Sequence, residues 1–332
     1  MNPSSIFRLV SSTSATFKAR GARKTVAATW YHLLGAASRA AGKRYLEKRI
    51  YDYRMLLDLN DRGISRTLLL FGERELEHKA MLEQVLRPGM TVLDIGANIG
   101  YYALMEKRLI GPGGVLIAVE PSPSNVGLLR RNLALNGYGD TEVHQGAVSD
   151  QSGTKRFFLS EMSNLNTFHD TGSGAHFLSG KTVDVVTFTV PEIMAGRKPD
   201  LIRMDVEGHE VEVFAGLLPA IERGEMAPMV IFETHLSRYG REHDMELPLR
   251  RFFALGYRVL LAGSSWEQGT KLIEAKGYRG TATIASDGVV RTIFEDIGQE
   301  DAIDLICREG GIRTVLLGRG PLEGLDVVSS KA

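Results

Sequence analysis

Apolar residues along this chain alternate between short continuous runs and longer segments with helical spacing. From about residue 51 onward, six short runs rich in Val, Ile and Leu end at Gly, Pro or acidic residues. They begin at residues 91, 115, 140, 200, 229 and 257 and read TVLDIG, VLIAVE, DTEVHQGAV, DLIRMDV, MVIFET and YRVLLAG. Continuous apolar strands separated by helices are typical of a parallel sheet buried on both faces. The pattern therefore predicts an α/β fold with a doubly wound, mostly parallel sheet and helices on both faces.

Most segments between these runs have the spacing of amphipathic helices. In one of them Val126, Leu129 and Leu133 mark an apolar side, and Gly137 suits the C-terminal end. Further along, the runs TATIAS, VVRTIF and RTVLLG predict strands whose order in the sheet the sequence leaves open. A different stretch, KRFFLS followed by many polar residues, predicts a strand leading into a loop inserted around residues 155–182. We expect one domain over residues 51–325, preceded by an extension over residues 1–50.

The first 46 residues contain basic side chains but no acidic ones. The basic residues are Arg8, Lys18, Arg20, Arg23, Lys24, Arg39, Lys43 and Arg44. The apolar stretch between them is too short and too polar to span a bilayer. Its helical spacing predicts a basic amphipathic helix with an apolar side formed by Trp30, Leu34, Ala37, Ala41 and Tyr45. Three interpretations stay open: a flexible extension, peripheral contact with a membrane, and an organelle-targeting segment.

Composition narrows the function classes. The 332 residues include 40 basic and 40 acidic side chains, so the formal net charge is zero. The overall electrostatic field of the protein would therefore not attract nucleic acid. The single cysteine, Cys307, rules out an internal disulfide and a cysteine-based zinc cluster. Because no secretory apolar core is apparent, we expect a cytoplasmic protein, with a membrane-peripheral or organelle location as alternatives set by the N-terminus.

The most specific local pattern is VLDIGANIGYY, residues 92–102. A buried strand leads through Asp94 into a glycine-containing loop, and a helix follows it. In such sheets ligands bind beyond the carboxyl ends of the strands. A dinucleotide fingerprint would place glycines at positions 96, 98 and 101, but this chain has Asn98 and Tyr101. The loop therefore argues against NAD and FAD.

What the loop keeps suits a cofactor without phosphates. Gly96 and Gly100 allow close approach of the backbone, and Asp94 supplies a carboxylate nearby. S-adenosylmethionine carries an ammonium, a sulfonium and a carboxylate, which an acid and bare backbone can accommodate. Glu120, 20 residues after Gly100, can accept hydrogen bonds from both ribose hydroxyls. Taken singly, Asp94 can be a turn residue and Glu120 a helix N-terminal acid, but together they favour this cofactor.

These stretches resemble the FkbM family of S-adenosylmethionine-dependent methyltransferases. The resemblance covers about residues 68–235 and rests on the motifs VLDIGANIGYYAL, IAVEPSPSN, NLALNG, GAVSD and DLIRMDVEGHEVEVFAG, with LLLFGERE upstream. It implies a Rossmann-like class I methyltransferase domain that O-methylates a sugar or polyketide hydroxyl. It also implies that the cofactor is bound by Glu73, Asp94, Gly96, Asn98, Gly100, Tyr101, Glu120 and Ala147, the last near the adenine. The chain departs from the family at VVTFTVPEI, where an acidic pair is common, and this leaves the substrate open.

An acidic cluster, DVEGHE at residues 205–210, follows the predicted fourth strand. Methyl transfer to a hydroxyl requires removal of its proton, by a general base or with help from a metal that lowers its pKa. The fifth strand should bring Glu233 and His235 to the same edge of the sheet as Asp205. We predict Asp205, Glu207 and His235 as catalytic groups. A magnesium or similar site formed with Asp205 and Glu233 is the alternative.

Other polar residues near this edge have two interpretations each. Glu210 suits the first turn of a helix, where the dipole stabilises an acid. His209 is either a substrate contact or a surface or capping residue. Asn166 and Thr167, in SNLNTF within the inserted loop, either contact the substrate or belong to an ordinary polar loop.

The sequence thus favours an S-adenosylmethionine-dependent O-methyltransferase. Its partner would be a hydroxyl compound, either a small molecule or a glycan: a sugar, a glycolipid or a polyketide-like acceptor. A cofactor-binding protein without transfer activity and an NAD(P)-dependent oxidoreductase are the alternatives. No nucleic-acid partner is expected.

Overall fold

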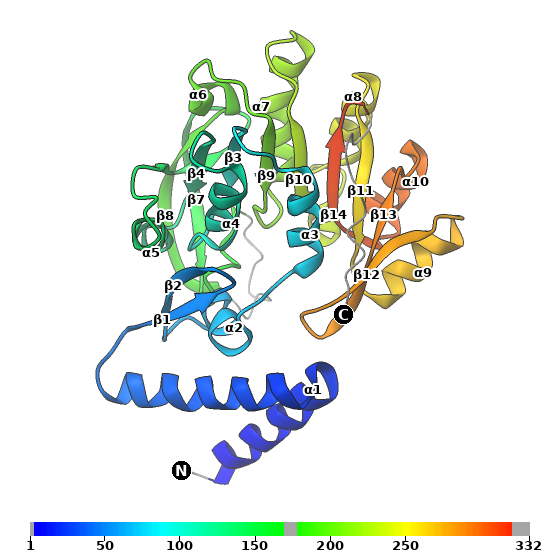
Figure 1. The fold of residues 1–332 in the computed structure, drawn as a ribbon. Coiled ribbons are helices and arrows are strands. Elements are labelled where there is room, and N and C mark those ends of the chain that lie inside the picture. The colour runs from blue at the N-terminus through cyan, green and yellow to red at the C-terminus, as the bar shows by residue number, and fades with distance from the viewer. Residues whose placement is uncertain (1–2, 169–177, 321–332) are drawn as a thin grey trace.

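The chain forms a layered α/β structure around a large twisted sheet (Figure 1). The computed structural model describes residues 3–168 and 178–320, with side chains from Gly21 onward. Among these residues, nine strands form the central sheet in the order β12-β13-β11-β14-β10-β9-β3-β4-β5. In that order their bounds are Gly280–Ser286, Val289–Glu295, Arg258–Ser264, Ile312–Gly318, Met229–Glu233, Leu201–Met204, Thr91–Ile95, Val115–Glu120 and Glu142–Gln145.

The direction of the strands confirms the predicted sheet. From β5 through β4, β3 and β9 to β10, all neighbours are parallel. Strand β14 runs antiparallel to both β10 and β11, and β13 runs antiparallel to both β11 and β12. Seven of the nine described strands therefore point the same way. The three C-terminal runs whose order was open become β12, β13 and β14, and β14 inserts between β10 and β11.

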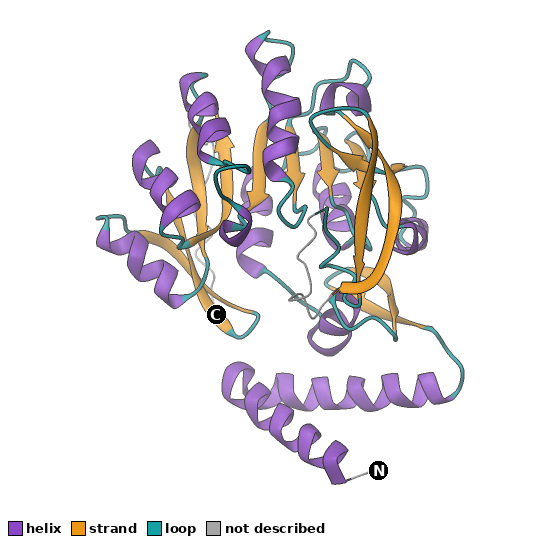
Figure 2. Ribbon diagram, turned by 180° about the vertical axis from the view of Figure 1, so that it is seen from behind, coloured by secondary structure: helices purple, strands orange, loops and turns teal. Residues whose placement is uncertain are grey.

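Helices pack on both faces of the sheet, as Figure 2 also shows. On one face the buried cluster includes residues of α6 (Val190–Met194), α7 (Glu210–Glu222), α8 (Glu246–Ala254), α9 (Glu267–Ala275) and α10 (Gln299–Ile303). On the other it includes residues of α2 (Ile64–Phe71), α3 (Leu76–Val85), α4 (Tyr101–Ile110) and α5 (Pro123–Leu135). Short helical turns, η2 (Leu236–Arg238) and η3 (Asp304–Arg308), follow β10 and α10. The two-faced burial explains why inner strands such as β4, β10 and β11 are largely apolar, whereas the outer strands β5 and β12 are more exposed.

The N-terminal extension is helical and is joined to the domain by a hairpin. Helix α1, Pro3–Ala40, is interrupted at Gly21, whose φ of 77° and ψ of 171° are not helical. After it, β1 (Tyr45–Ile50) pairs antiparallel with β2 (Tyr53–Asp58). The pairing links the expected extension to the expected domain, because β1 and β2 lie on opposite sides of the boundary at residue 50.

The predicted insertion forms part of a small second sheet. Among the described residues, β7 (Gly153–Ser160) pairs antiparallel with β8 (Leu178–Phe188), and β6 (Ala147–Val148) pairs with the far end of β8. The segment after β7 returns to it, because the backbones of Phe158 and Thr167 form a β-bridge. Residues 169–177 of the expected loop lie outside the described part of the chain. This hairpin places residues 163–168 near the carboxyl ends of the central strands.

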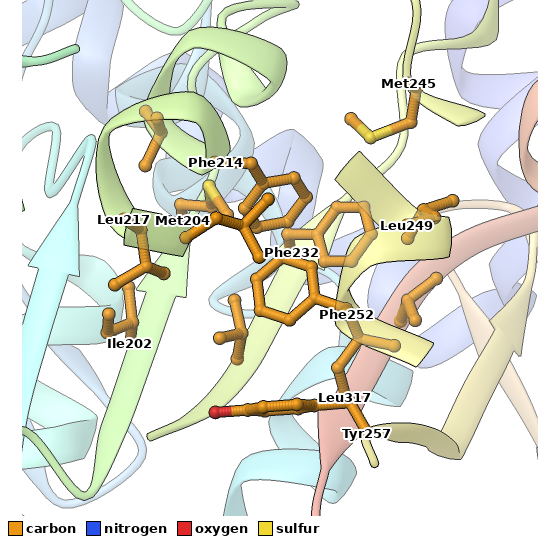
Figure 3. Packing of buried hydrophobic residues seen from close by; sticks show 14 of the residues in the cluster. Ile202, Met204, Phe214, Leu217, Phe232, Met245, Leu249, Phe252, Tyr257 and Leu317 are labelled. Carbon is orange, nitrogen blue, oxygen red and sulfur yellow. The ribbon is translucent and has the colours of Figure 1, made fainter. Parts of the chain in front are cut away.

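Aromatic packing holds α7 and α8 against the sheet (Figure 3). The ring of Phe214 meets the rings of Phe232 and Phe252 edge-on, with centroids 5.1 and 4.9 Å apart. Phe252 also meets Tyr257 edge-on at 5.0 Å. All four side chains are fully buried, so this cluster fixes α7 and α8 relative to β10.

We expect Phe252→Ala to lower the free energy of unfolding by about 3–5 kcal/mol, because it leaves a cavity among three packed rings. Leu247→Ala on the same helix is the matched control. Its side chain is 62% exposed, so the change should stay within about 0.5 kcal/mol. Urea unfolding followed by circular dichroism measures both. Equal effects of the two substitutions would contradict the packing described.

Candidate active site

A cleft opens at the carboxyl ends of β3, β4 and β9, where the sheet topology leads ligand sites to be expected. Its empty volume is about 540 Å³. The loops after β3, β4 and β9 form one side, and the segment between β7 and β8 forms the other. Of the residues predicted for the site, those that line the cleft are Gly96, Asn98, Glu120, Ala147, Asn166, Asp205, Glu207 and His209.

The loop after β3 is a tight backbone turn. Gly96, Asn98 and Gly100 all have positive φ angles, of 81°, 50° and 94°. A Cβ atom on Gly96 would lie 2.1 Å from the carbonyl oxygen of Asp205, so no larger residue fits between this loop and the end of β9. Gly100 has a different role, because a Cβ there would lie 2.8 Å from Leu129 of α5. Gly100 therefore allows the start of α4 to pack closely against α5, and it does not line the cleft.

Glu120 ends β4 and tethers the loop after β3. Its carboxylate accepts hydrogen bonds from the backbone amide of Asn98 (2.9 Å), from the amide of Ser122 (2.9 Å) and from Asn125 Nδ2 (3.2 Å). Burial raises the pKa of Glu120 to about 7, against the effect of these donors. The side chain is 4% exposed yet lines the cleft, so it is a preorganised acceptor for hydroxyl groups of a ligand.

Asp94, predicted to contact the cofactor, is fully buried and does not line the cleft. Its Oδ1 lies 3.1 Å from Arg203 Nη1. The Arg203 guanidinium also donates to the carbonyl of Gly96 at 3.2 Å, lies 3.4 Å from Asp205 Oδ2 and stacks on the ring of Tyr102 at 4.2 Å. Asp94 therefore acts on the cleft through Arg203, which joins the loop after β3 to the end of β9.

Arg203 was missed by the sequence reasoning. It lies within the apolar run LIRMDV, and a charged residue at the centre of a buried strand is the signal that could have revealed it. Burial alone would lower the pKa of Arg203, but Asp94 and Asp205 raise it, so the guanidinium stays charged. Its partners hold it in place on both sides.

Two other residues implied by the resemblance lie away from the cleft. Glu73 forms an ion pair with Lys24 of α1, and it is not among the residues that line the cleft. Tyr101 is buried, and its hydroxyl donates to the carbonyl of Arg74 at 2.8 Å. Tyr101 and Arg74 line a smaller adjoining cavity of about 290 Å³, which shares Asn98 with the cleft.

The predicted catalytic trio does come together. Asp205 and Glu207 follow β9, and His235 follows β10; one ligand atom from each lies within 4.8 Å of the others. His235 Nε2 is 3.6 Å from Glu207 Oε2, and its Nδ1 is 2.8 Å from Glu210 Oε1. Glu207 adopts a left-handed backbone conformation with a φ of 50°. Such strain in a non-glycine residue is common at functional sites.

The electrostatics of the trio favour proton exchange. Burial, reinforced by Asp205, raises the pKa of Glu207 to about 8. Burial alone would lower the pKa of His235, but the charge and hydrogen bond of Glu210 raise it well above its usual value. Glu210 is the first residue of α7, as expected for a helix N-terminal acid, and it also orients His235. The site thus holds a protonated imidazole between two carboxyl groups.

Glu233, the second residue of the predicted metal pair, is engaged elsewhere. Its Oε1 lies 2.7 Å from Arg313 Nη2, and Arg313 also binds Glu75 at 2.8 Å. Burial raises the pKa of Glu233 to about 7, and Arg313 opposes this. In the described part of the chain, the residues grouped so that they can share a metal ion are Asp205, Glu207 and His235, without Glu233.

The segment after β7 closes over the cleft. Thr167 Oγ1 donates to the carbonyl of Glu207 at 3.1 Å, and Asn98 Nδ2 donates to the carbonyl of Ser163 at 3.3 Å. Asn166 lines the cleft, but its Oδ1 accepts from the amide of Ser160 and so shapes the segment. His209 is buried, with Nε2 3.0 Å from Ser149 Oγ. Its ring also packs on Phe168.

Asp94→Asn should lower the free energy of unfolding by about 3–5 kcal/mol, because it leaves the buried Arg203 charge without its main partner. Replacing both residues, as Asp94→Leu with Arg203→Met, should cost less than the sum of the two single changes. Glu300→Gln, which breaks an exposed pair with Arg250, is the control and should change stability by less than about 1 kcal/mol. Urea unfolding measures each of these variants, including Asp94→Leu and Arg203→Met as single changes. An Asp94→Asn variant with unchanged stability and weakened cofactor binding would return Asp94 to the cofactor site.

Comparison with known proteins shows which family this chain resembles. The family model for the methyltransferase FkbM domain matches residues 94–259, half of the chain. The chain is 28% identical over 160 residues to 31-O-demethyl-FK506 methyltransferase FkbM of Streptomyces tacrolimicus, covering 40% of this chain and 61% of that protein. It is 25% identical over 144 residues to Methyltransferase 1 of Beauveria bassiana, covering 38% and 57%.

The matches thus span about 60% of the length of these two relatives. Among solved structures, Methyltransferase FkbM from Methylobacillus flagellatus KT aligns with a TM-score of 0.33 and 14% identity, over 70% of this chain and 54% of that one. The family match covers the loop after β3, Glu120, and the cluster formed by Asp205, Glu207 and His235. This chain belongs to the FkbM methyltransferase family.

Proposed function

We propose that this protein transfers a methyl group from S-adenosylmethionine to a hydroxyl group of a sugar, a glycolipid or a polyketide-like compound. The observation that carries the proposal is the position of the cluster formed by Asp205, Glu207 and His235. Asp205 and Glu207 themselves line a cleft whose other residues suit this cofactor. Membership of the FkbM family supports the reaction type. The choice of an oxygen as the methyl acceptor is supported by the name of the 31-O-demethyl-FK506 methyltransferase, which specifies an oxygen without its methyl group. The classes of acceptor are those that the resemblance to the family implies.

The groups around the cleft fit S-adenosylmethionine. The buried Glu120 carboxylate faces the cleft and can accept from ribose hydroxyls. Within the described part of the chain, three buried oxygens beside it accept no hydrogen bond: Asn98 Oδ1, Asn164 Oδ1 and Asp205 Oδ1. Buried acceptors without donors are costly, and the cofactor's ammonium would supply donors. Arg74, in the adjoining cavity, provides a cation near the same loop for a carboxylate.

Glu207 is suited to take the proton of the acceptor hydroxyl. When bound, the cofactor supplies an electrophilic methyl group on a sulfonium. With a pKa of about 8, Glu207 is a stronger base than an ordinary carboxylate and is still partly deprotonated near neutral pH. His235 holds the Glu207 carboxyl in place and is itself held by the fully buried Glu210. Burial raises the pKa of Glu207, and repulsion from Asp205 adds to this.

A divalent cation is the alternative way to activate the hydroxyl. The three atoms of the cluster are close enough to share one, and the contact of Nδ1 with Glu210 would direct Nε2 towards it. Without a metal, each ring nitrogen of His235 already faces a carboxylate, Nε2 that of Glu207 and Nδ1 that of Glu210. We therefore propose direct proton transfer to Glu207. The predicted pair of Asp205 with Glu233 is not proposed, because Glu233 pairs with Arg313.

Calorimetry with S-adenosylmethionine tests the cofactor. Glu120→Gln should weaken binding by about 10- to 100-fold, because a carboxylate accepts hydroxyl hydrogen bonds more strongly than an amide. Glu83→Gln, on the outer side of α3, should leave the affinity within about twofold. No saturable heat is expected with NAD. Binding of NAD without binding of S-adenosylmethionine would favour the oxidoreductase alternative and contradict the proposal.

Glu207→Gln should keep cofactor affinity within a few-fold and lower methyl transfer by about 100-fold or more. Wild-type turnover should rise with pH and be half-maximal near pH 8, because the deprotonated fraction of Glu207 follows its raised pKa. Transfer is measured by mass spectrometry of a glycan and polar-metabolite extract from cells lacking the protein, as a gain of one CH₂ per site. Glu222→Gln, at the far end of α7, is the control and should keep full turnover.

Chelator added to the same assay separates the two ways of activating the hydroxyl. Unchanged turnover is expected with direct proton transfer. Loss of turnover that added magnesium restores would assign the cluster to a metal instead. A variant Glu207→Gln that turns over normally without chelator would show that Glu207 is not the base.

A further inference from the structure

Helix α1 carries an apolar stripe on its outer side. After the kink at Gly21, the side chains of Val26, Trp30 and Leu33 are 70, 63 and 49% exposed. Ala37, one helical turn further on, is exposed as well. The spacing of three and four residues puts all of them on one face of the helix. Large apolar side chains this exposed, and arranged in one row, indicate a surface made for contact. We call these four residues the α1 stripe.

The opposite side of α1 is packed onto the domain. Ala28 is buried, and a Cβ atom on Gly35 would lie 3.2 Å from Leu69 of α2. Lys48 of β1 lies over the ring of Tyr31 at 3.9 Å. With further contacts from Arg39 and Lys24, the helix is fixed to α2 and the β1–β2 hairpin. The α1 stripe therefore faces away from the domain core, and Figure 1 shows α1 along one end of the molecule.

This outcome corrects the apolar side predicted from the sequence. The helix ends at Ala40, so Ala41 lies beyond it and Tyr45 begins β1. Leu34 is half-buried, whereas Leu33 is exposed. The packed side of α1 uses small residues such as Ala28 and Gly35, which allow close approach to α2. The larger apolar residues are left on the outside.

The segment that carries the α1 stripe is basic. Residues 21–46 contain five basic and no acidic side chains, although the whole chain is neutral. Arg23 precedes the stripe and Lys43 follows it, whereas Lys24 and Arg39 contact the domain. A convex helix with Trp and aliphatic side chains between basic ends complements an anionic lipid surface, where Trp lies at the headgroup level and basic residues attract the phosphates.

We propose that α1 binds the surface of a bilayer that contains anionic phospholipids, with Val26, Trp30 and Leu33 inserted below the headgroups. In the described part of the chain no helix is long and apolar enough to cross a membrane. Contact in the plane of the interface is the mode that the α1 stripe fits. The proposal does not depend on the methyl-transfer reaction.

Helix α1 lies near the cleft, so membrane binding by α1 would affect where the cleft is held. A cavity of about 820 Å³ lies between α1 and residues 58–62, lined in part by His32 and Asp61. Asp61 also lines a second cavity of about 730 Å³, which shares Ser163 and Asn166 with the candidate active site. The two cavities thus lie side by side between α1 and the cleft, and Ser163 donates to Asp61 where they meet. A membrane-bound α1 would hold the cleft beside the lipid surface.

Sedimentation with vesicles tests the proposal on the full chain. Binding is expected to vesicles of phosphatidylcholine mixed with phosphatidylglycerol and not to phosphatidylcholine alone, and added salt should weaken it. The triple variant Val26→Ser, Trp30→Ser, Leu33→Ser should bind at least about tenfold more weakly. The matched control is Leu247→Ser with Trp266→Ser, which removes side chains of similar exposure from other helical regions and should bind normally. Because all these side chains are exposed, every variant should keep the wild-type melting temperature.

Fluorescence gives an independent readout, since Trp30 and Trp266 are the two tryptophans of the chain. In Trp266→Phe, which retains Trp30, the emission should shift to shorter wavelength when anionic vesicles are added. In Trp30→Phe, which retains Trp266, it should not shift.

Three results would overturn the proposal. They are equal binding to neutral and anionic vesicles, full binding by the triple variant, and an unchanged Trp30 emission. Analytical ultracentrifugation of the same variants tests the alternative that the α1 stripe binds a second copy of the chain. Self-association that the triple variant abolishes, without any vesicle binding, would assign the stripe to a second copy of the chain.

Discussion

The Arg203 guanidinium, buried in the centre of the sheet, is the group on which the geometry of the site depends. A charge in such a place is tolerated only if carboxylates and carbonyls surround it, and Asp94, Asp205 and the carbonyl of Gly96 do so. These contacts join two neighbouring strand ends. They set the distance between the loop that faces the cleft and the acidic cluster opposite. The removal of one partner leaves an unpaired charge, so this part of the site cannot vary independently of the fold.

A second set of charges follows from the first. Asp205, held by Arg203, repels Glu207 and so helps to raise its pKa to about 8. On the other side Glu210 keeps His235 protonated and in position. Two acids of the same short motif therefore differ in role because their surroundings differ. Glu210 is fully buried against a cation, and Glu207 stands beside another acid at the cleft. Such divergence is what proton transfer near neutral pH requires.

The apolar residues of the N-terminal helix fall on two sides, one packed against the domain and one exposed. Gly35 and Ala28 let α1 approach the domain closely, and this places Trp30 and Leu33 outside. The cavities between α1 and the cleft place the helix near the site. The same chain thus combines an acidic methyltransferase domain with a basic, apolar edge. We propose a different partner for each, a cofactor for the cleft and a lipid surface for the edge.

Local pattern indicated the strands and helices, the loop at Gly96 and Gly100, and the acids of residues 205–210, because each depends on residues close in sequence. The expected parallel order of neighbouring strands then brought His235 towards Asp205. Local pattern also indicated Glu120, since strand and helix lengths fix where that carboxylate emerges. Tertiary structure decided what depends on distant partners. In the folded chain Asp94 pairs with Arg203 and Glu233 pairs with Arg313. Strand β14 lies between β10 and β11, and the packing of α1 determines which of its sides is exposed. Burial and charge pairing act through space, so residue spacing alone cannot predict them.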